Sequence, residues 1–168
     1  LVVITAFWSV HYTWQNALND VGSKLSVANN SIVFLQKEQG AELRGFVESY
    51  QFQIKLKERD SDFTNWVRDQ AGKYNSDYIA LHPISYVDQL PATIVKALSL
   101  GISRTFFQVM EQDDLKNISP VLASKAYVVN KEDNSIEKRG LISRTLIPIF
   151  NEHGHLEWIV DSGILLNN

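Results

Sequence analysis

The chain has 168 residues, of which 45% are hydrophobic and 21% charged, and its formal net charge is −3. This length and apolar content fit one domain with a sizeable core and exclude a disordered chain. The nearly balanced charge argues against a protein that binds nucleic acid by neutralising phosphates, so we expect no nucleic-acid partner. The absence of cysteine excludes disulfides, thiolate metal sites and thiol nucleophiles.

Residues 1–10, LVVITAFWSV, carry no charge, and aromatic residues lie close to their end at Trp8, Tyr12 and Trp14. This run is too short to span a bilayer, which needs about 20 residues. One interpretation is the outer end of a transmembrane helix whose aromatic residues lie in the membrane interface. The alternative is an apolar first turn packed on the core. We favour the first interpretation and expect a membrane-anchored protein.

A hydrophobic heptad follows within residues 11–56, which we interpret as a long helical region. Apolar residues recur at alternating steps of four and three: Trp14, Leu18, Val21, Leu25, Ala28, Ile32 and Leu35. This narrow stripe predicts a helix that pairs with its copy in a homodimer, although a helix packed on its own sheet is compatible with it. We expect Gly40 to end or kink this helix. Helical and strand periods overlap from Tyr50 to Leu56, and we favour helix.

Residues 57–168 read as helices followed by antiparallel strands, which is the pattern of an α+β domain. A helix is expected after the charged break at 57–62, and another between Pro91 and Gly101. We expect a central strand at 78–81 and further strands at 102–110, 123–130, 139–150 and 156–166. Residues 82–89 are irregular, and the charged segment 131–138 is expected at a hairpin tip.

No catalytic motif is present: the sequence has no GxSxG, no Gly-rich phosphate loop and no HExxH. Glu152, His153 and His155 have the residue types of a metal site, but they lie in a predicted turn, where a polar turn without metal is the favoured interpretation. The adjacent carboxylates of Asp113 and Asp114 are expected to be solvated. We therefore expect no enzymatic activity, no metal and no cofactor.

Arg144 is the first candidate for ligand binding. It lies inside an apolar strand pattern and shares a strand face with Ile142, Leu146 and Pro148. An unpaired guanidinium in such surroundings is costly, so Arg144 needs either an anionic ligand or an acidic partner. Asp161 on the next predicted strand is the candidate for that partner.

Four further residues are candidates for the same site. Arg104 begins a predicted strand, where a solvated strand end is the alternative. His82 ends the first strand, where a pocket mouth would lie; the alternative is a locally hydrogen-bonded turn histidine. Lys125 and Tyr127 are expected on one face of the 123–130 strand, and an exposed sheet edge is their alternative.

Three segments, in this order and spacing, resemble a single Cache domain. They are ALSLGISRTFF at 97–107, RGLISRTLIPI at 139–149 and GHLEWIVDSGILLN at 154–167. These PAS-like sensor domains lie outside the cytoplasm in bacterial histidine kinases, chemoreceptors and diguanylate cyclases. The resemblance covers about residues 77–168. The chain departs from the family where Arg104 replaces the usual glycine, and where 82–90 is shorter than the usual second strand and its loop.

The resemblance implies a long N-terminal helix on an antiparallel sheet of about five strands, with a sensor core at 57–168. It also implies periplasmic sensing of a small molecule or partner protein, with the signal passing through the N-terminal helix. In relatives that sense citrate and C4-dicarboxylates, an arginine four residues before a strand proline contacts the ligand carboxylate, and Arg144 has this position relative to Pro148. Leu146 stands at the second basic position of the citrate sensors, so a tricarboxylate is not expected to bind in the same way.

A second function from a different class stays open. The chain can instead be a protein-interaction module that uses a sheet edge and binds no small molecule. We favour the sensor that binds a small anionic ligand, such as a carboxylate or an amino acid.

Overall fold

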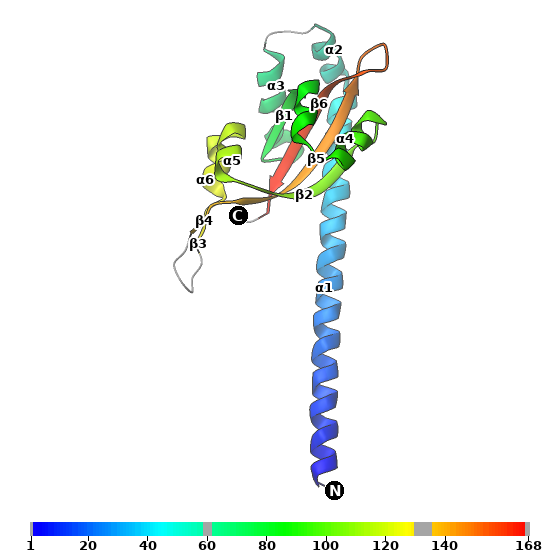
Figure 1. Cartoon of the computed structure of the whole chain (residues 1–168), viewed down its shortest axis with the longest axis vertical. Helices are drawn as coiled ribbons and strands as arrows, with labels where there is room; N and C mark the ends of the chain where they lie inside the picture. Colours follow the sequence, from blue (N-terminus) through cyan, green and yellow to red (C-terminus); the bar gives the residue numbers. More distant parts are fainter. Residues whose placement is uncertain (1, 59–61, 130–135, 167–168) are drawn as a thin grey trace. The chain divides into compact units, whose positions relative to one another are not determined.

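A computed structural model of the chain describes residues 2–58, 62–129 and 136–166 (Figure 1). The chain has two compact units, residues 1–35 and 36–168. The first unit is the N-terminal part of helix α1 (Val2–Glu48), so the predicted long helix is confirmed. No helix among the described residues combines the length and the apolar content that a membrane span requires.

The heptad side chains that are described in the first unit are exposed. The exposed fraction ranges from 39% to 65% in Leu18, Val21, Leu25, Ile32 and Leu35. Such a row of large apolar side chains on a helix needs a facing surface to leave water. The homodimer expected through this row stays a prediction.

The second unit begins with the last residues of α1 and continues through short helices and antiparallel strands. Its elements are α2 (Tyr50–Glu58), α3 (Phe63–Asp69), the 3-10 helix η1 (Ala71–Tyr74), β1 (Tyr78–Pro83), the 3-10 helix η2 (Ile84–Gln89), α4 (Ala92–Ser99), β2 (Arg104–Met110), α5 (Gln112–Ile118), α6 (Pro120–Lys125), β3 (Val128–Val129), β4 (Ile136–Glu137), β5 (Gly140–Phe150) and β6 (Leu156–Leu165). The predicted α+β class is confirmed, and so are helix at 50–56 and the strands at 102–110, 139–150 and 156–166.

The main sheet has the strand order β1-β6-β5-β2, and all of its pairs are antiparallel. β3 and β4 form a separate two-stranded sheet. The strand expected to be central, β1, is therefore an edge strand. Its apolar character comes from burial on both faces, because Ile79 packs into one core cluster and Tyr78 into another.

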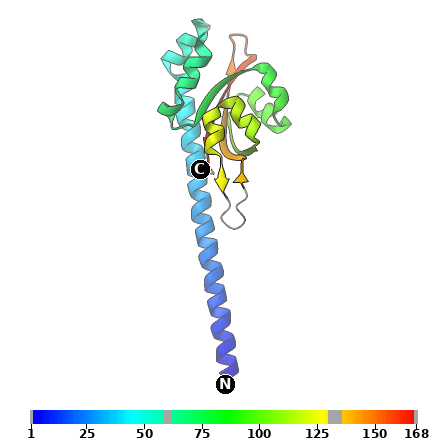
Figure 2. The same ribbon diagram turned by 90° about the vertical axis from the view of Figure 1, so that its left-hand side faces the viewer.

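Helices cover both faces of the main sheet. Residues 43–47 of α1 pack with α2 and α3 against one face, over Ile147, Ile149 and Val160. On the other face, α5 and α6 pack around Ile142, while α4 and η2 pack around Leu146 and Ile159. Figure 2 shows the green helix α4 and the cyan end of α1 on opposite sides of the strands.

Of the two alternatives expected at Gly40, an end or a kink of the helix, the end is wrong, because α1 continues to Glu48. Leu43, Phe46 and Val47 follow the glycine and are buried under the sheet. Burial of each such side chain contributes about 1.5–3 kcal/mol, whereas a glycine inside a helix costs about 1 kcal/mol. Tertiary packing therefore carries the helix past Gly40.

The strand expected at 123–130 is also wrong. Pro120 begins α6 at the position where proline is well tolerated, and the buried residues Leu122, Ala123 and Ala126 follow with helical spacing. Within the described residues 123–129, only Val128–Val129 pairs as a strand, with Ile136–Glu137 as its partner. Of the hairpin tip predicted at 131–138, residues 131–135 lie outside the described residues, and Ile136–Glu137 form strand β4.

Candidate ligand-binding site

A cavity of about 490 Å³ lies along the edge strand β1. Its wall combines residues from α3, η1, β1, η2, β2, α5 and β5. Polar and charged members of this wall include Tyr78, His82, Tyr86, Gln108, Asp114 and Arg144. Met110 and Ile118 contribute apolar surface. The cavity therefore has the mixed lining that is typical of small-molecule sites.

The cavity-lining residue Arg144 on β5 forms a buried ion pair with Asp161 on β6. Arg144 donates to Asp161 through Nε to Oδ1 at 2.9 Å and through Nη2 to Oδ2 at 2.6 Å. Arg144 is 2% exposed and Asp161 is fully buried. The acidic partner expected from the sequence is thus confirmed, and it neutralises the guanidinium inside the domain.

Two further groups donate to Asp161. The Tyr78 hydroxyl donates to Oδ1 at 3.1 Å, and His82 Nε2 lies 3.2 Å from Oδ2. Burial raises the pKa of the Asp161 carboxyl, but the hydrogen bond from His82 and the charge and bonds of Arg144 outweigh burial and leave this pKa lowered. Burial also raises the pKa of Tyr78, and the neighbouring carboxylate raises it further. Asp161 is therefore an ionised acceptor among neutral and cationic donors.

Arg144 also binds two cavity-lining groups outside the ion pair. Its Nη1 donates to Gln108 Oε1 at 2.7 Å, and its Nη2 donates to the Tyr86 hydroxyl. The Tyr86 ring stacks on His82 with ring centroids 3.9 Å apart and an interplanar angle of 11°. Burial raises the pKa of Tyr86, so its hydroxyl keeps its proton. Within the described part of the chain, the second N–H of Nη1 has no acceptor.

The structure brings two of the predicted site residues together, Arg144 and His82. Arg104 is exposed at the start of β2 and is not part of this wall. Lys125 ends α6 and binds Asp77 at 3.1 Å, and the Tyr127 hydroxyl accepts from Gln112. The expectation that Lys125 and Tyr127 share a strand face is wrong, because Lys125 belongs to α6 and Tyr127 precedes β3.

Sequence reasoning missed Tyr86 and Gln108. The sequence did contain a signal for Gln108. It is the polar residue in the alternating row Phe106, Gln108 and Met110, and a polar side chain on an otherwise apolar strand face indicates a specific contact. Tyr86 had none, because residues 84–89 form a 3-10 helix in a segment without a hydrophobic period.

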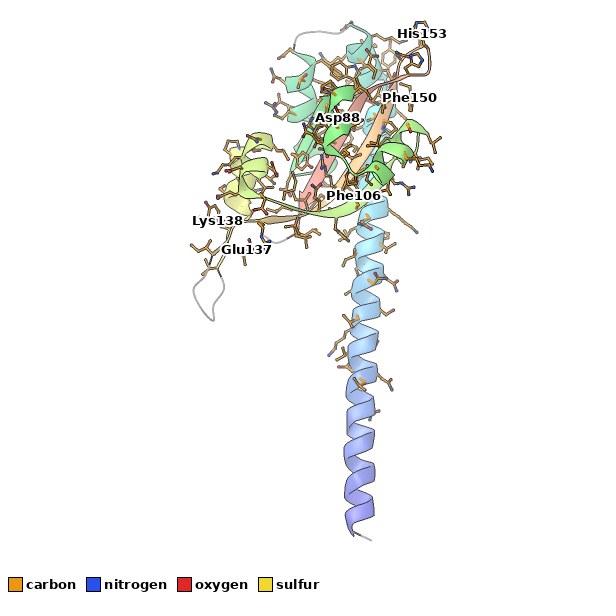
Figure 3. The ribbon with its side chains drawn as sticks, viewed as in Figure 1. Asp88, Phe106, Glu137, Lys138, Phe150 and His153 are labelled. Atoms are coloured by element: carbon orange, nitrogen blue, oxygen red, sulfur yellow. The ribbon has the colours of Figure 1, made fainter. Side chains whose placement is uncertain are left out.

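The turn that joins β5 and β6 is held by hydrogen bonds from its backbone to the Asn151 side chain. Asn151 Oδ1 accepts from the backbone N–H groups of His153 and His155, each at 3.0 Å. Figure 3 shows His153 at this turn, beyond Phe150 at the end of β5. Among the side chains that the structure describes, no three of His, Cys, Asp or Glu are close enough to hold a metal ion.

Comparison with known proteins leaves the family open. No protein-family model matches the chain, and no curated protein matches it significantly. The resemblance to single Cache domains therefore stays a hypothesis.

Proposed function

We propose that residues 36–168 are the ligand-binding part of an extracytoplasmic sensory domain in a bacterial transmembrane signal transducer. The observation that carries the proposal is Arg144, a buried arginine in a cavity wall with an N–H group left for a ligand. The ligand is a small molecule with a carboxylate. The domain has no catalytic role of its own, and any kinase or cyclase would be a separate output module.

Three donors near Arg144 suit a carboxylate. They are the remaining N–H of Nη1, the Gln108 side-chain amide, and the Tyr86 hydroxyl, whose proton is not used in accepting from Arg144. A carboxylate only accepts hydrogen bonds, and bonds that involve charged groups contribute about 1.5–3 kcal/mol each. Because Asp161 already neutralises Arg144, these directed bonds, more than net charge, would hold the ligand.

A route from the ligand to α1 supports a sensory role. Ser143 is next to Arg144 on β5 but faces the opposite side of the sheet, where its Oγ donates to Gln39 Oε1 at 2.8 Å. Gln39 Nε2 returns a bond to the Ser143 backbone oxygen at 3.1 Å. A shift of β5 on ligand binding would thus be felt by α1, to the extent that the ligand binds the two states unequally. The exposed heptad of α1 would pair in a membrane-anchored homodimer.

The test is a thermal-shift screen of acetate, succinate, L-malate, citrate, L-alanine and L-glutamate, followed by calorimetry. A ligand at 100 times its dissociation constant adds about 2.7 kcal/mol to the unfolding free energy. Gln108→Leu and Tyr86→Phe remove donors but leave the ion pair, so we expect each to weaken binding about 10-fold or more. Tyr127→Phe is the matched control and should bind like the wild type. Absence of any stabilising carboxylate would refute the proposal.

A second candidate function is protein interaction without a small molecule. It is favoured by the edge strand β2, which exposes Phe107 (43%) and Val109 (57%) next to an unpaired backbone edge. This function predicts that no compound in the screen binds. It also predicts that Val109→Lys, a charge on the edge, disrupts association measured by sedimentation of the wild type and variant.

A further inference from the structure

The cavity along β1 meets the main chain of this strand as well as its side chains. Six consecutive residues, 77–82, line it. Neighbouring side chains of a strand point to opposite faces of the sheet, and the Ile79 side chain is buried in the core cluster of α1, α2 and α3. A cavity can meet six consecutive residues only where it runs along the edge of the strand. β2, in contrast, lines the cavity with the alternate residues Gln108 and Met110, and thus with one face.

The backbone of β1 has hydrogen-bonding groups to offer along this edge. β1 is the outer strand of the main sheet, next to β6. In the described part of the chain, the backbone groups of residues 79–82 bond to no segment other than β6. Alternate residues of a paired strand point their N–H and C=O groups away from the partner strand, so these groups are open to a ligand. Extended peptides bind to sheet edges through such groups.

We propose that the ligand is a short peptide that pairs with β1 as an added strand and places its C-terminal carboxylate at Arg144. This inference rests on the proposed carboxylate site and names the class of ligand that occupies it. The backbone bonds to β1 would hold the peptide, and the Arg144 donors would select a free C-terminus.

The donors for the carboxylate lie beside β1. Asp161 Oδ2 accepts from Arg144 Nη2 at 2.6 Å, and Nε2 of His82, a residue of β1, lies 3.2 Å from the same oxygen. Tyr86, which binds Arg144, stacks on the His82 ring. One ligand can therefore pair with the β1 backbone and reach the Arg144 donors with its last residue.

The cavity has walls on both sides of the β1 edge, as an added strand requires. α3 and η1 lie toward one face of the sheet and α5 toward the other. Side chains of an added strand would point alternately toward these two walls. The lining residues of the walls are Thr64, Arg68 and Ala71 on one side and Asp114, Asn117 and Ile118 on the other.

The size of the cavity fits a peptide of about three to five residues. A strand rises about 3.3 Å per residue, so such a peptide extends over about 10–17 Å, within the length of the six-residue strand β1. The volume of about 490 Å³ lies within the range of about 300–1,000 Å³ that is typical of ligand pockets.

The experiment compares acetylated tetrapeptides Ala-Ala-X-Ala, with X varied over the common amino acids, with acetyl-alanine in calorimetry. The best tetrapeptide should bind about 10-fold or more tightly than acetyl-alanine, because it adds backbone bonds to β1. Its C-terminal amide should bind about 10-fold or more weakly than the acid. Two neighbouring peptide bonds are then N-methylated one at a time. One methyl group should weaken binding about 10-fold and the other less than about threefold, since alternate N–H groups face β1.

Two variants on α3 separate the strand site from the carboxylate site. Thr64 is exposed and lines the cavity, and its neighbour Asn65 is exposed but is not part of the lining. Thr64→Tyr should narrow the cavity beside β1 and weaken tetrapeptide binding about 10-fold, while acetyl-alanine binds as before. Asn65→Tyr is the matched control and should change neither affinity.

The outcomes separate this inference from the proposed function. If a carboxylate binds but no tetrapeptide binds more tightly than acetyl-alanine, the added strand is refuted and the carboxylate site stands. Equal losses from the two N-methyl groups, an amide that binds as tightly as the acid, or an unchanged peptide affinity in Thr64→Tyr would also refute the inference. If neither a carboxylate nor a peptide binds, both proposals fail.

Discussion

The buried pair of Arg144 and Asp161 predicts strong energetic coupling between two strands. Arg144→Met keeps most of the side-chain volume but removes the charge. Asp161→Leu does the same for the carboxylate. Each single change leaves the other charge in a buried position, since the exposed fractions of the two residues are 2% and 0%. The double variant removes both charges and leaves apolar side chains in their place.

The magnitudes follow from the contacts. Arg144→Met removes two charge-assisted bonds to Asp161, each worth about 1.5–3 kcal/mol, so we expect it to cost about 3–5 kcal/mol. Asp161→Leu also removes the acceptor of Tyr78 and His82 and should cost as much or more. The double variant should cost less than either single, so the two costs are coupled by more than about 3 kcal/mol, because neither charge is then left alone.

Urea unfolding followed by circular dichroism measures these differences. If a single variant does not fold, the double variant still tests the reasoning, because it should be more stable than either single. Lys125→Met is the matched control: its pair with Asp77 is 45% and 20% exposed, and its loss should cost no more than about 1 kcal/mol. Additive costs in the cycle, or an Arg144→Met cost as small as that of Lys125→Met, would refute the buried-pair argument.

Three further predictions concern pH and assembly. The folded-state pKa of Asp161 is lowered, so Asp161 stabilises the fold fully above the ordinary aspartate pKa of about 4. This stabilisation is lost as pH falls through the lowered pKa. In urea unfolding, the free energy of unfolding of the Arg144→Met/Asp161→Leu variant should therefore fall less steeply with decreasing pH than that of the wild type. The raised pKa of Tyr78 gives stability that is full below about pH 10 and declines above it, and Tyr78→Phe should flatten that decline in alkaline urea titrations. Leu18→Glu with Leu25→Glu should weaken self-association in sedimentation without loss of fold, and an unchanged oligomeric state would contradict the helix seam.

Elements with a clear hydrophobic period could be predicted from sequence, and those decided by tertiary contacts could not. β5 and β6 have long apolar patterns separated by a turn, so their pairing and the contact of Arg144 with Asp161 could be predicted from the sequence. The segment 123–130 contains Val and Tyr, which favour strands locally. Its first residues nevertheless belong to α6, because Leu122, Ala123 and Ala126 are buried with helical spacing.

Residues of the candidate site could be predicted from the sequence only where they lie on regular strands. The position of Arg144 follows from strand alternation, and that of His82 from the end of β1. Tyr86 lies on η2, where no period places a side chain. Lys125 pairs with Asp77 and not with Arg144 or His82. This pairing depends on how α6 packs, and no pattern in the sequence around Lys125 predicts it.

Gly163 on β6 predicts a steric coupling to the same site. A Cβ at this position would lie 2.3 Å from Tyr78 Cε1 and 2.8 Å from Ile142 Cγ2, closer than van der Waals contact allows. Tyr78 is the direct partner of Gly163 across the β1–β6 pair, so its ring packs over the glycine, as aromatic residues do across strands. Gly163→Ala must displace that ring and pull its hydroxyl from Asp161 Oδ1, at 3.1 Å.

We expect Gly163→Ala to cost about 1–3 kcal/mol of unfolding free energy from overpacking, plus about 1 kcal/mol for the lost hydrogen bond. In a Tyr78→Ala background the ring is absent, so the same change should cost much less in urea unfolding. Gly45→Ala is the control: an added Cβ there has no neighbour within 4 Å, and inside α1 it should stabilise by about 0.5–1 kcal/mol. An equal cost of Gly163→Ala with and without the Tyr78 ring would show that the ring is not what requires glycine, and the steric link between this strand pair and the Asp161 site would be wrong.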